Sequence, residues 1–238
     1  MLTQEIKIKS FDVDHNDRIR ISSLMKYFQQ IARENLDSLG MTYNFLRQHN
    51  IVFVLTGYTI KLHAEIHSDD TVILKTAPCA VRGVSFIRDF TVESTNGKLL
   101  AEASSAWVII DFEKRSVLRP NRLPIEIPTF DKLVDFIPER TNVREEFEFT
   151  FNSQVTYSKL DANNHLNNCN YIDILLDGLY KEKNGDVPFF KMLNMRFEHE
   201  AKLGDDLRLQ YSFSDNICYV KCVNLSNDSI CFTAELEF

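Results

Sequence analysis

The 238-residue sequence predicts an α+β fold made of two copies of one unit, each an antiparallel sheet wrapped around a long helix. Three observations predict this fold. Each half contains one helical apolar pattern, four strand-like segments follow that pattern, and the two halves superpose at constant shifts along the chain. With 44% hydrophobic residues, the chain can bury the core that each copy needs.

The first half opens with alternating, strand-like sequence and continues into an amphipathic helix over residues 22–39. Its apolar residues include Leu24, Phe28 and Ile31, and Gly40 follows the last of them as a helix-ending residue. The next segments are rich in β-branched and aromatic residues and predict strands at 51–64, 71–76, 85–92 and 99–110. Asn96-Gly97 between the last two is typical of a hairpin turn.

A charged stretch between about residues 112 and 144 holds four of the six prolines and shows little periodicity, which indicates a connection between domains. After it, the pattern of the first half returns. It predicts a strand near 146–155, a helix through Tyr171 and Leu179, and strands at 191–200, 206–213, 217–225 and 229–238. We therefore expect an N-terminal domain at 1–130, with the connection after about 112, and a C-terminal domain at 131–238.

The two halves also match residue by residue. A shift of 147 places Asp14 on Asp161 and Arg18 on His165, and a shift of 135 beyond the helix places Glu65 on Glu200. Each sheet must hide its apolar face against its own helix, which is the hotdog arrangement. The predicted fold class is thus a tandem, or double, hotdog.

Composition excludes several classes of function. A net charge of -7 argues against a general nucleic-acid binder, whose affinity comes from phosphate neutralisation. No apolar run approaches the roughly 20 residues that cross a bilayer, so no membrane partner is expected. The five cysteines are odd in number without repeated spacing, and the first residues do not resemble an export signal. We expect reduced thiols and a cytoplasmic location.

A polar segment, residues 160–168, precedes the second helix. Its Asp161, Asn163 and His165 can activate water and stabilise the oxyanion that forms when a thioester is attacked. The following helix adds N–H groups and positive potential. Asn and Asp are also ordinary turn and capping residues, so composition alone also fits a segment that only starts the helix.

The run Asp161-x-Asn163-x-His165-x-Asn167-Asn168-x-x-Tyr171 closely resembles the active-site motif of acyl-ACP thioesterases, which release fatty acids from acyl carrier protein (ACP). The similarity extends to the first half, at Asp14, Arg18, Gln29, residues 70–72 and residues 103–108.

The resemblance implies a catalytic network of Asp161, Asn163 and His165, with Glu200 as the downstream catalytic glutamate. Many plant members carry a cysteine where this chain has Ala201, so a cysteine nucleophile at that position is excluded. The implied reaction is hydrolysis of fatty acyl-ACP to free fatty acid and holo-ACP, with no metal or organic cofactor. Glu200 would be the base for the attacking water, and Asn163 with helix N–H groups would stabilise the carbonyl.

Two alternatives stay open, an acyl-CoA thioesterase of the same fold and a non-catalytic acyl-binding module. In the first copy Arg18 replaces His165 while the helix and strands retain large apolar residues, so we expect that copy to hold the acyl chain; neutral drift is the other explanation of the exchange. ACP is acidic, so we expect a basic docking surface on the first half, with the candidates Arg82, Arg88, Lys114, Arg115 and Arg119. A homodimer is also left open by the sequence.

Other reactive residues have simpler interpretations. Cys169 lies four residues after His165 but fits a packed thiol better than a nucleophile. Cys218, Cys222 and Cys231 lack the CxxC spacing of a metal site and are expected in the core. Residues 12–17 begin like a calcium loop, but the required glycine and glutamate are replaced by Asp17 and Ser23.

Overall fold

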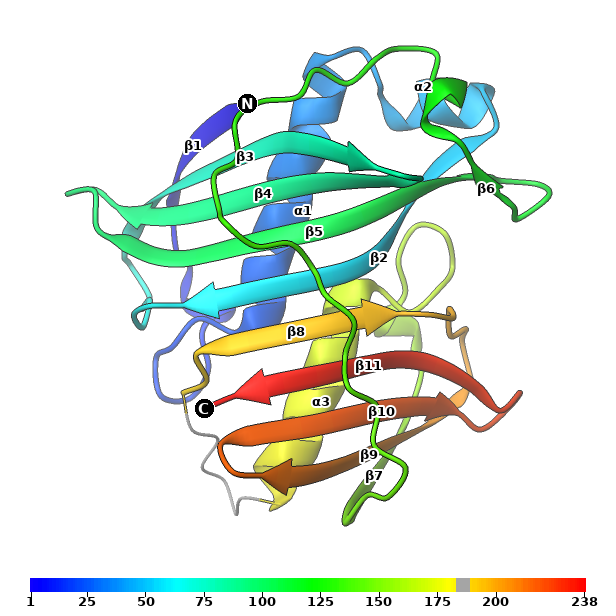
Figure 1. Ribbon diagram of the computed structural model, residues 1–238. Coiled ribbons are helices and arrows are strands. Elements are labelled where there is room, and N and C mark those ends of the chain that lie inside the picture. The colour runs from blue at the N-terminus through cyan, green and yellow to red at the C-terminus, as the bar shows by residue number, and fades with distance from the viewer. Residues whose placement is uncertain (183–188) are drawn as a thin grey trace. The chain divides into compact units, whose positions relative to one another are not determined.

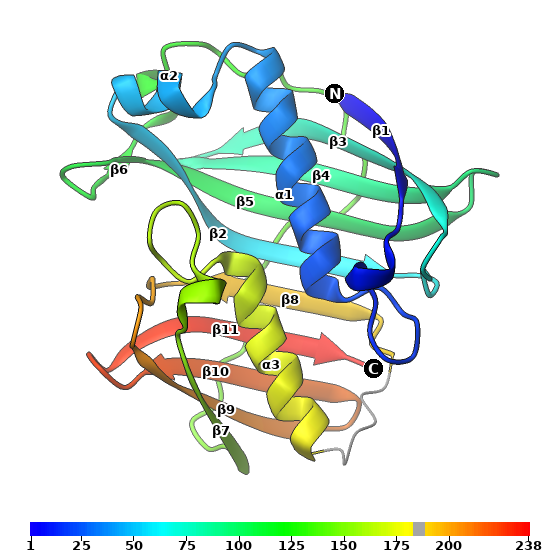
Figure 2. The ribbon, with the colours of Figure 1, turned by 180° about the vertical axis from the view of Figure 1, so that it is seen from behind.

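The structure, a computed structural model, describes residues 1–182 and 189–238 and divides into two compact units, Met1–Pro138 and Glu139–Phe238 (Figure 1). In each unit one long helix lies against one face of an antiparallel sheet, as Figures 1 and 2 show from opposite sides. The predicted double hotdog fold is confirmed. None of the helices in these residues is long and apolar enough to span a bilayer.

The first unit contains the long helix α1 (Ile21–Ser38) and a short helix, α2 (Tyr43–Gln48). Its strands are β1 (Leu2–Lys7), β2 (Ile51–Leu62), β3 (Thr71–Arg82), β4 (Ser85–Ser94), β5 (Leu99–Asp111) and β6 (Val117–Leu118). They form an antiparallel sheet in the order β1-β3-β4-β5-β2, and β6 pairs with β5 beyond the start of β4.

The second unit repeats this topology around α3 (Asn168–Glu182). Its strands are β7 (Phe149–Gln154), β8 (Met192–Phe197), β9 (Asp206–Ser214), β10 (Ile217–Asn224) and β11 (Ser229–Glu237). The order β7-β9-β10-β11-β8 is that of the first unit, with each strand replaced by its counterpart, and all pairs are antiparallel. The two units therefore share one strand order, as the internal duplication in the sequence predicts.

Helix α1 buries the side that the sequence pattern predicts. Phe28 and Ile31 are both 0% exposed, and Phe28 packs against Phe90 with ring centroids 4.7 Å apart. The helix ends where Gly40 adopts a φ of +82°, which allows the N–H of Met41 to reach the carbonyl of Leu36 at 3.0 Å. This is a Schellman ending, in which glycine tolerates the left-handed conformation.

The prediction that Arg88 belongs to a basic docking surface is wrong. Arg88 is only 6% exposed, because it lies on the helix-facing side of β4, the side that carries Phe90. Its guanidinium donates to the side-chain oxygens of Asn35 at 3.0 Å and Thr76 at 3.1 Å. Burial lowers its pKa to about 10. Arg88 therefore cannot contact a carrier protein.

The connection after β6 follows the sheet face opposite to α1, in front of the sheet in Figure 1. Asp89, 1% exposed, accepts the N–H groups of Leu133 at 3.2 Å and Val134 at 3.5 Å. Further along, in the second unit, the side chain and backbone N–H of Asn142 both donate to Glu235 at 2.7 Å. Hydrogen bonds to the Asp89 and Glu235 side chains, and one from the N–H of Phe130 to the Pro78 carbonyl at 2.9 Å, hold this stretch.

Candidate active site

The loop before α3 is organised by one carboxylate. Asp161 Oδ1 accepts the backbone N–H groups of Asn163 at 2.8 Å and His165 at 3.1 Å. The N–H of Asp161 donates to the carbonyl of His165 at 2.8 Å, which closes the loop on itself. Asn164 takes a positive φ of 65°, which Asn tolerates better than most residues. The loop is thus a fixed turn that holds the ring of His165 at its end.

The ring of His165 meets Glu200 from the segment between β8 and β9. His165 Nε2 lies 3.3 Å from Glu200 Oε2, and the two side chains are 19% and 35% exposed. Two backbone contacts fix this approach. His165 forms an isolated antiparallel bridge with Lys202, and the N–H of Leu166 donates to the carbonyl of Ala201 at 2.8 Å. The imidazole and the carboxylate are therefore paired while remaining accessible to a substrate.

The structure brings the four predicted residues into one cluster, with different contacts for the two acids. Glu200 contacts the ring of His165, whereas Asp161 bonds its backbone N–H. The side chain of Asn163 is exposed, and its Nδ2 donates to Asp161 Oδ2 at 3.4 Å. A carboxylate, an imidazole and a carboxamide in this arrangement can activate water and donate to a developing oxyanion.

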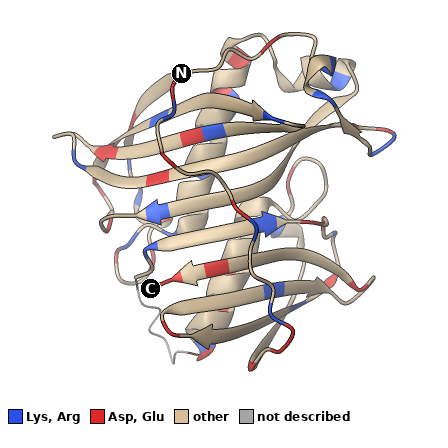
Figure 3. Ribbon diagram, in the orientation of Figure 1, with Lys and Arg blue, Asp and Glu red and all other residues tan. Residues whose placement is uncertain are grey.

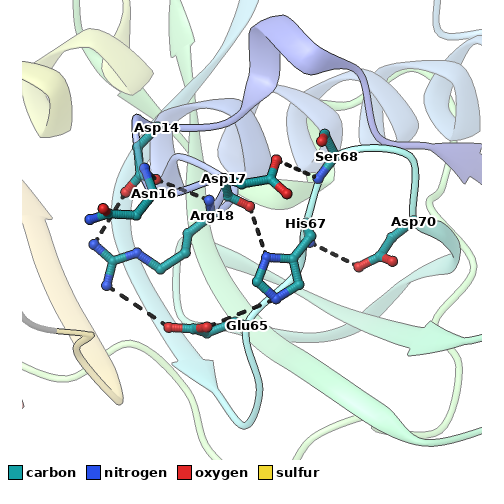
Figure 4. A network of polar contacts seen from close by, with 8 residues as sticks. All are labelled: Asp14, Asn16, Asp17, Arg18, Glu65, His67, Ser68 and Asp70. Carbon is teal, nitrogen blue, oxygen red and sulfur yellow. Dashed lines mark hydrogen bonds and ion pairs between the residues drawn. The ribbon is translucent and has the colours of Figure 1, made fainter.

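The first unit carries a second version of this loop (Figure 4). Asp14 Oδ1 accepts the N–H groups of Asn16 at 2.8 Å and Arg18 at 3.0 Å, and Asp17 takes a positive φ of 59°. The guanidinium of Arg18 lies 3.4 Å from Asp14 and 3.9 Å from Glu65. Arg18 thus replaces the imidazole, and its ion pairs replace the contact between His165 and Glu200.

The two versions differ in what they can do with a proton. Arginine stays protonated in proteins, so Arg18 cannot exchange protons at neutral pH as an imidazole does. The segment beyond the glutamate is nevertheless the same. Asp70 accepts the N–H of His67 at 2.8 Å, and Asp205 accepts that of Lys202 at 2.8 Å. The first unit has an imidazole beside its glutamate as well, His67, whose Nε2 lies 3.9 Å from Glu65 Oε2, but that ring comes from the segment after β2 and not from the loop before the helix (Figure 4). At the loop position itself, the second unit has the titratable ring of His165 and the first unit has Arg18.

Two protein-family models match this chain, one in each half. The family model described as "Acyl-ACP thioesterase N-terminal domain" matches residues 1–127, and that described as "Acyl-ACP thioesterase C-terminal domain" matches residues 142–236. The chain belongs to the acyl-ACP thioesterase family. The resemblance stated from the motif is thereby confirmed.

Curated plant members of the acyl-ACP thioesterase family are similar to this chain. The chain is 24% identical over 226 residues to the "Palmitoyl-acyl carrier protein thioesterase, chloroplastic" of Arabidopsis thaliana, which covers 87% of the chain and 53% of that protein. It is 23% identical over 190 residues to "Acyl-[acyl-carrier-protein] hydrolase FATB1, chloroplastic" of Cuphea viscosissima, covering 72% and 45%. The chain spans about half the length of these relatives.

Solved structures of the acyl-ACP thioesterase family share the fold over nearly the whole chain. An acyl-ACP thioesterase from Bacteroides thetaiotaomicron superposes with a TM-score of 0.87 at 22% identity, covering 99% of this chain and 96% of that one. A 12:0-ACP thioesterase from Umbellularia californica gives a TM-score of 0.82 at 15% identity with the same coverage.

The cysteines of this acyl-ACP thioesterase family member are all free, and four are buried. Cys169 is 2% exposed in the first turn of α3, where its N–H donates to the Asn167 side chain at 2.9 Å. Cys79, the partly exposed one, lies in the first unit, and burial raises its pKa to about 12. Over the described residues, no three His, Cys, Asp or Glu side chains are grouped as metal ligands would be.

Sequence reasoning missed one contact of the site. The N–H of Ala201, next to Glu200, donates to the hydroxyl of Tyr171 at 2.9 Å. A signal for it was present, because the shift of 147 that aligns the two loops also aligns Tyr171 with Leu24, an exchange of a hydrogen-bonding side chain for an apolar one.

Proposed function

We propose that the protein hydrolyses fatty acyl-ACP to free fatty acid and holo-ACP. The observation that carries this proposal is the contact of 3.3 Å between His165 and Glu200, held above a loop that Asp161 organises. Membership of the acyl-ACP thioesterase family supports the substrate class. The five free cysteines fit a reducing compartment, and we propose the cytoplasm.

In the proposed reaction, Glu200 takes a proton from water as the water oxygen attacks the thioester carbonyl carbon. His165 orients Glu200 and relays the proton, and Asp161 keeps the His165 backbone in place. Asn163 and the N–H groups at the start of α3 stabilise the oxyanion. The C–S bond then breaks, and the carrier sulfur leaves as a thiol after receiving the proton.

The test compares matched acyl-ACP and acyl-CoA substrates of the same chain length. We expect free fatty acid and free holo-ACP thiol in equal amounts, with kcat/KM at least about tenfold higher for acyl-ACP because carrier contacts add to transition-state binding. Equal or faster hydrolysis of acyl-CoA would identify an acyl-CoA thioesterase. Binding of acyl-ACP without turnover would identify a non-catalytic acyl-binding module.

We propose further that ACP docks on a basic edge of the first unit, defined by Arg82, Lys114, Arg115 and Arg119. Residues 112–122 carry four cationic side chains against one carboxylate, in a chain whose net charge is -7 (Figure 3). On β5, the partner of Leu118 in β6 is Ile109, and the partner of Ser85 at the start of β4 is the adjacent Val108. The turn that precedes β4 therefore lies beside residues 112–122. Exposed apolar side chains, Val81, Val84 and Val117, lie within the same edge. The positive charge of this edge complements the negative charge of ACP, and its exposed apolar side chains can be buried in the complex.

Reversal of charge at this edge should weaken carrier binding without altering chemistry. For the double variant Arg82→Glu/Arg119→Glu, we expect KM for acyl-ACP to rise about tenfold and its salt dependence to flatten, with kcat retained. The double variant Lys98→Glu/Arg208→Glu changes charge equally at exposed positions outside the edge and should keep the wild-type KM. If both variants raise KM equally, or if a carrier-free acyl thioester is affected as strongly, docking on this edge is excluded.

The acyl chain, we propose, is held by the first unit. Its helix and sheet keep large apolar side chains, among them Phe28, Ile31 and Phe90, while Arg18 stands at the loop position of His165. Because this unit does not have to carry out proton transfer, its core can vary to fit the acyl chain that it binds. We therefore expect its core residues to set the preference for acyl-chain length.

A further inference from the structure

The peptide that follows Glu200 is held from both sides. The N–H of Ala201 donates to the Tyr171 hydroxyl at 2.9 Å, and the carbonyl of Ala201 accepts the N–H of Leu166 at 2.8 Å. Ala201, Leu166 and Tyr171 are 0%, 3% and 2% exposed. Because Leu166 follows His165 directly, the residue at 201 links the backbones of the two members of the catalytic pair.

Tyr171 itself is immobilised by its surroundings. Its ring packs between Phe197 and Phe232, with centroid distances of 6.1 Å and 5.5 Å. Cys231 and Cys222 lie near its hydroxyl. Burial raises the pKa of Tyr171, so the hydroxyl stays neutral while it accepts the N–H of Ala201. The hydroxyl is thus a fixed acceptor.

The first unit provides an internal comparison. Its loop bonds Ile66, the counterpart of Ala201, in the same way, with the N–H of Ile19 donating to the Ile66 carbonyl at 2.8 Å. Leu24 stands where the second unit has Tyr171, and Leu24 and Ile66 border a small apolar cavity of about 10 Å³. The carbonyl bond is therefore common to both units, whereas the hydroxyl bond belongs to the unit that carries His165.

We propose that Tyr171 is a positioning residue of the proposed hydrolase, which sets the direction of Glu200 toward His165 by holding the N–H of Ala201. The inference rests on the proposed function. The Glu200 side chain is 35% exposed, and the orientation of the 200–201 peptide sets the direction in which it leaves the backbone. A displacement on the order of 1 Å at a reacting group costs about 10²-fold in rate.

The variant Tyr171→Phe removes only the hydroxyl. We expect kcat to fall about 10- to 100-fold with KM unchanged, and the pH range of near-maximal kcat to narrow as the contact between Glu200 and His165 loosens. The matched control is Tyr211→Phe in the same unit. Tyr211 is also 2% exposed, and its hydroxyl donates to the Gly178 carbonyl at 3.2 Å. The control should keep kcat and the pH profile, and both variants should melt within about 4 °C of wild type.

A second measurement does not depend on turnover. The ¹⁵N chemical shift of His165 Nε2 reports its contact with Glu200, and we expect it to move in Tyr171→Phe but not in Tyr211→Phe. An unchanged shift together with wild-type kcat in Tyr171→Phe would overturn the proposal. Equal losses in both variants would also overturn it, by showing a structural role only. If wild-type protein does not hydrolyse acyl-ACP, the proposed function fails, and the nitrogen shift still decides whether Tyr171 positions the pair.

Discussion

Asp161→Asn and Glu200→Gln are each expected to lower kcat for acyl-ACP by about 10²–10⁴, with little change in KM. Glu200→Gln keeps the size of the side chain but removes the base. In Asp161→Asn the amide oxygen can still accept the N–H groups of Asn163 and His165, so the loop persists while the negative charge is lost. The measurement is single-turnover and steady-state hydrolysis, with circular dichroism to confirm folding.

Groups that act as one unit lose activity non-additively, so the double variant should be scarcely worse than the poorer single variant. His165→Ala should fall in the same range. The control is Cys169→Ala, which removes a thiol that is 2% exposed and should remain largely active. Near-wild-type turnover by both carboxamide variants would contradict the mechanism, and an inactive but folded Cys169→Ala protein would restore the thiol as a nucleophile.

Phe28→Ala is expected to change both stability and product profile. The side chain is 0% exposed and packs on Phe90 and Tyr58, with centroids 4.7 Å and 6.2 Å away, so its loss should cost about 3–5 kcal/mol of unfolding free energy. If the first unit holds the acyl chain, the space gained beside α1 should shift hydrolysis toward longer chains. Urea unfolding and competition among acyl-ACPs of increasing length measure the two effects.

Ile31→Trp should act in the opposite direction on chain length, because it fills the same core. The control is Leu236→Ala in the second unit, which is also 0% exposed and should cost about 2–5 kcal/mol without altering the product profile. A profile that stays constant in both Phe28→Ala and Ile31→Trp would place the chain elsewhere.

Much of the fold was predictable because its signals are local. The helix expected at 22–39 runs from Ile21 to Ser38, and Asn96-Gly97 forms the hairpin between β4 and β5, with Gly97 at a φ of +84°. Strand β3 continues to Arg82 instead of ending at 76, since a bulge between Pro78 and Ala80 carries the pairing past the proline. Helix α2 was missed because its six residues are too few for a period.

The site was predictable in membership but not in contacts. The motif identified the loop residues, yet the partner of Glu200 depends on where the segment after β8 meets that loop, which no local pattern encodes. The misplaced Arg88 had a readable signal. Strict alternation along β4 puts Arg88 on the same side as Phe86 and Phe90, which predicts burial. The general preference of arginine for the surface predicts exposure, and for Arg88 that prediction is wrong.

The pair of matched loops, one with Arg18 and one with His165, has an evolutionary consequence. In an isologous dimer of identical chains, every substitution appears twice, so exchanging the imidazole for a guanidinium would remove it from both subunits at once. Joining the two copies in one polypeptide ends that symmetry constraint. The loop of the first unit can then carry Arg18, which stays protonated and pairs with Asp14 and Glu65. The loop of the second unit keeps His165, which can exchange a proton.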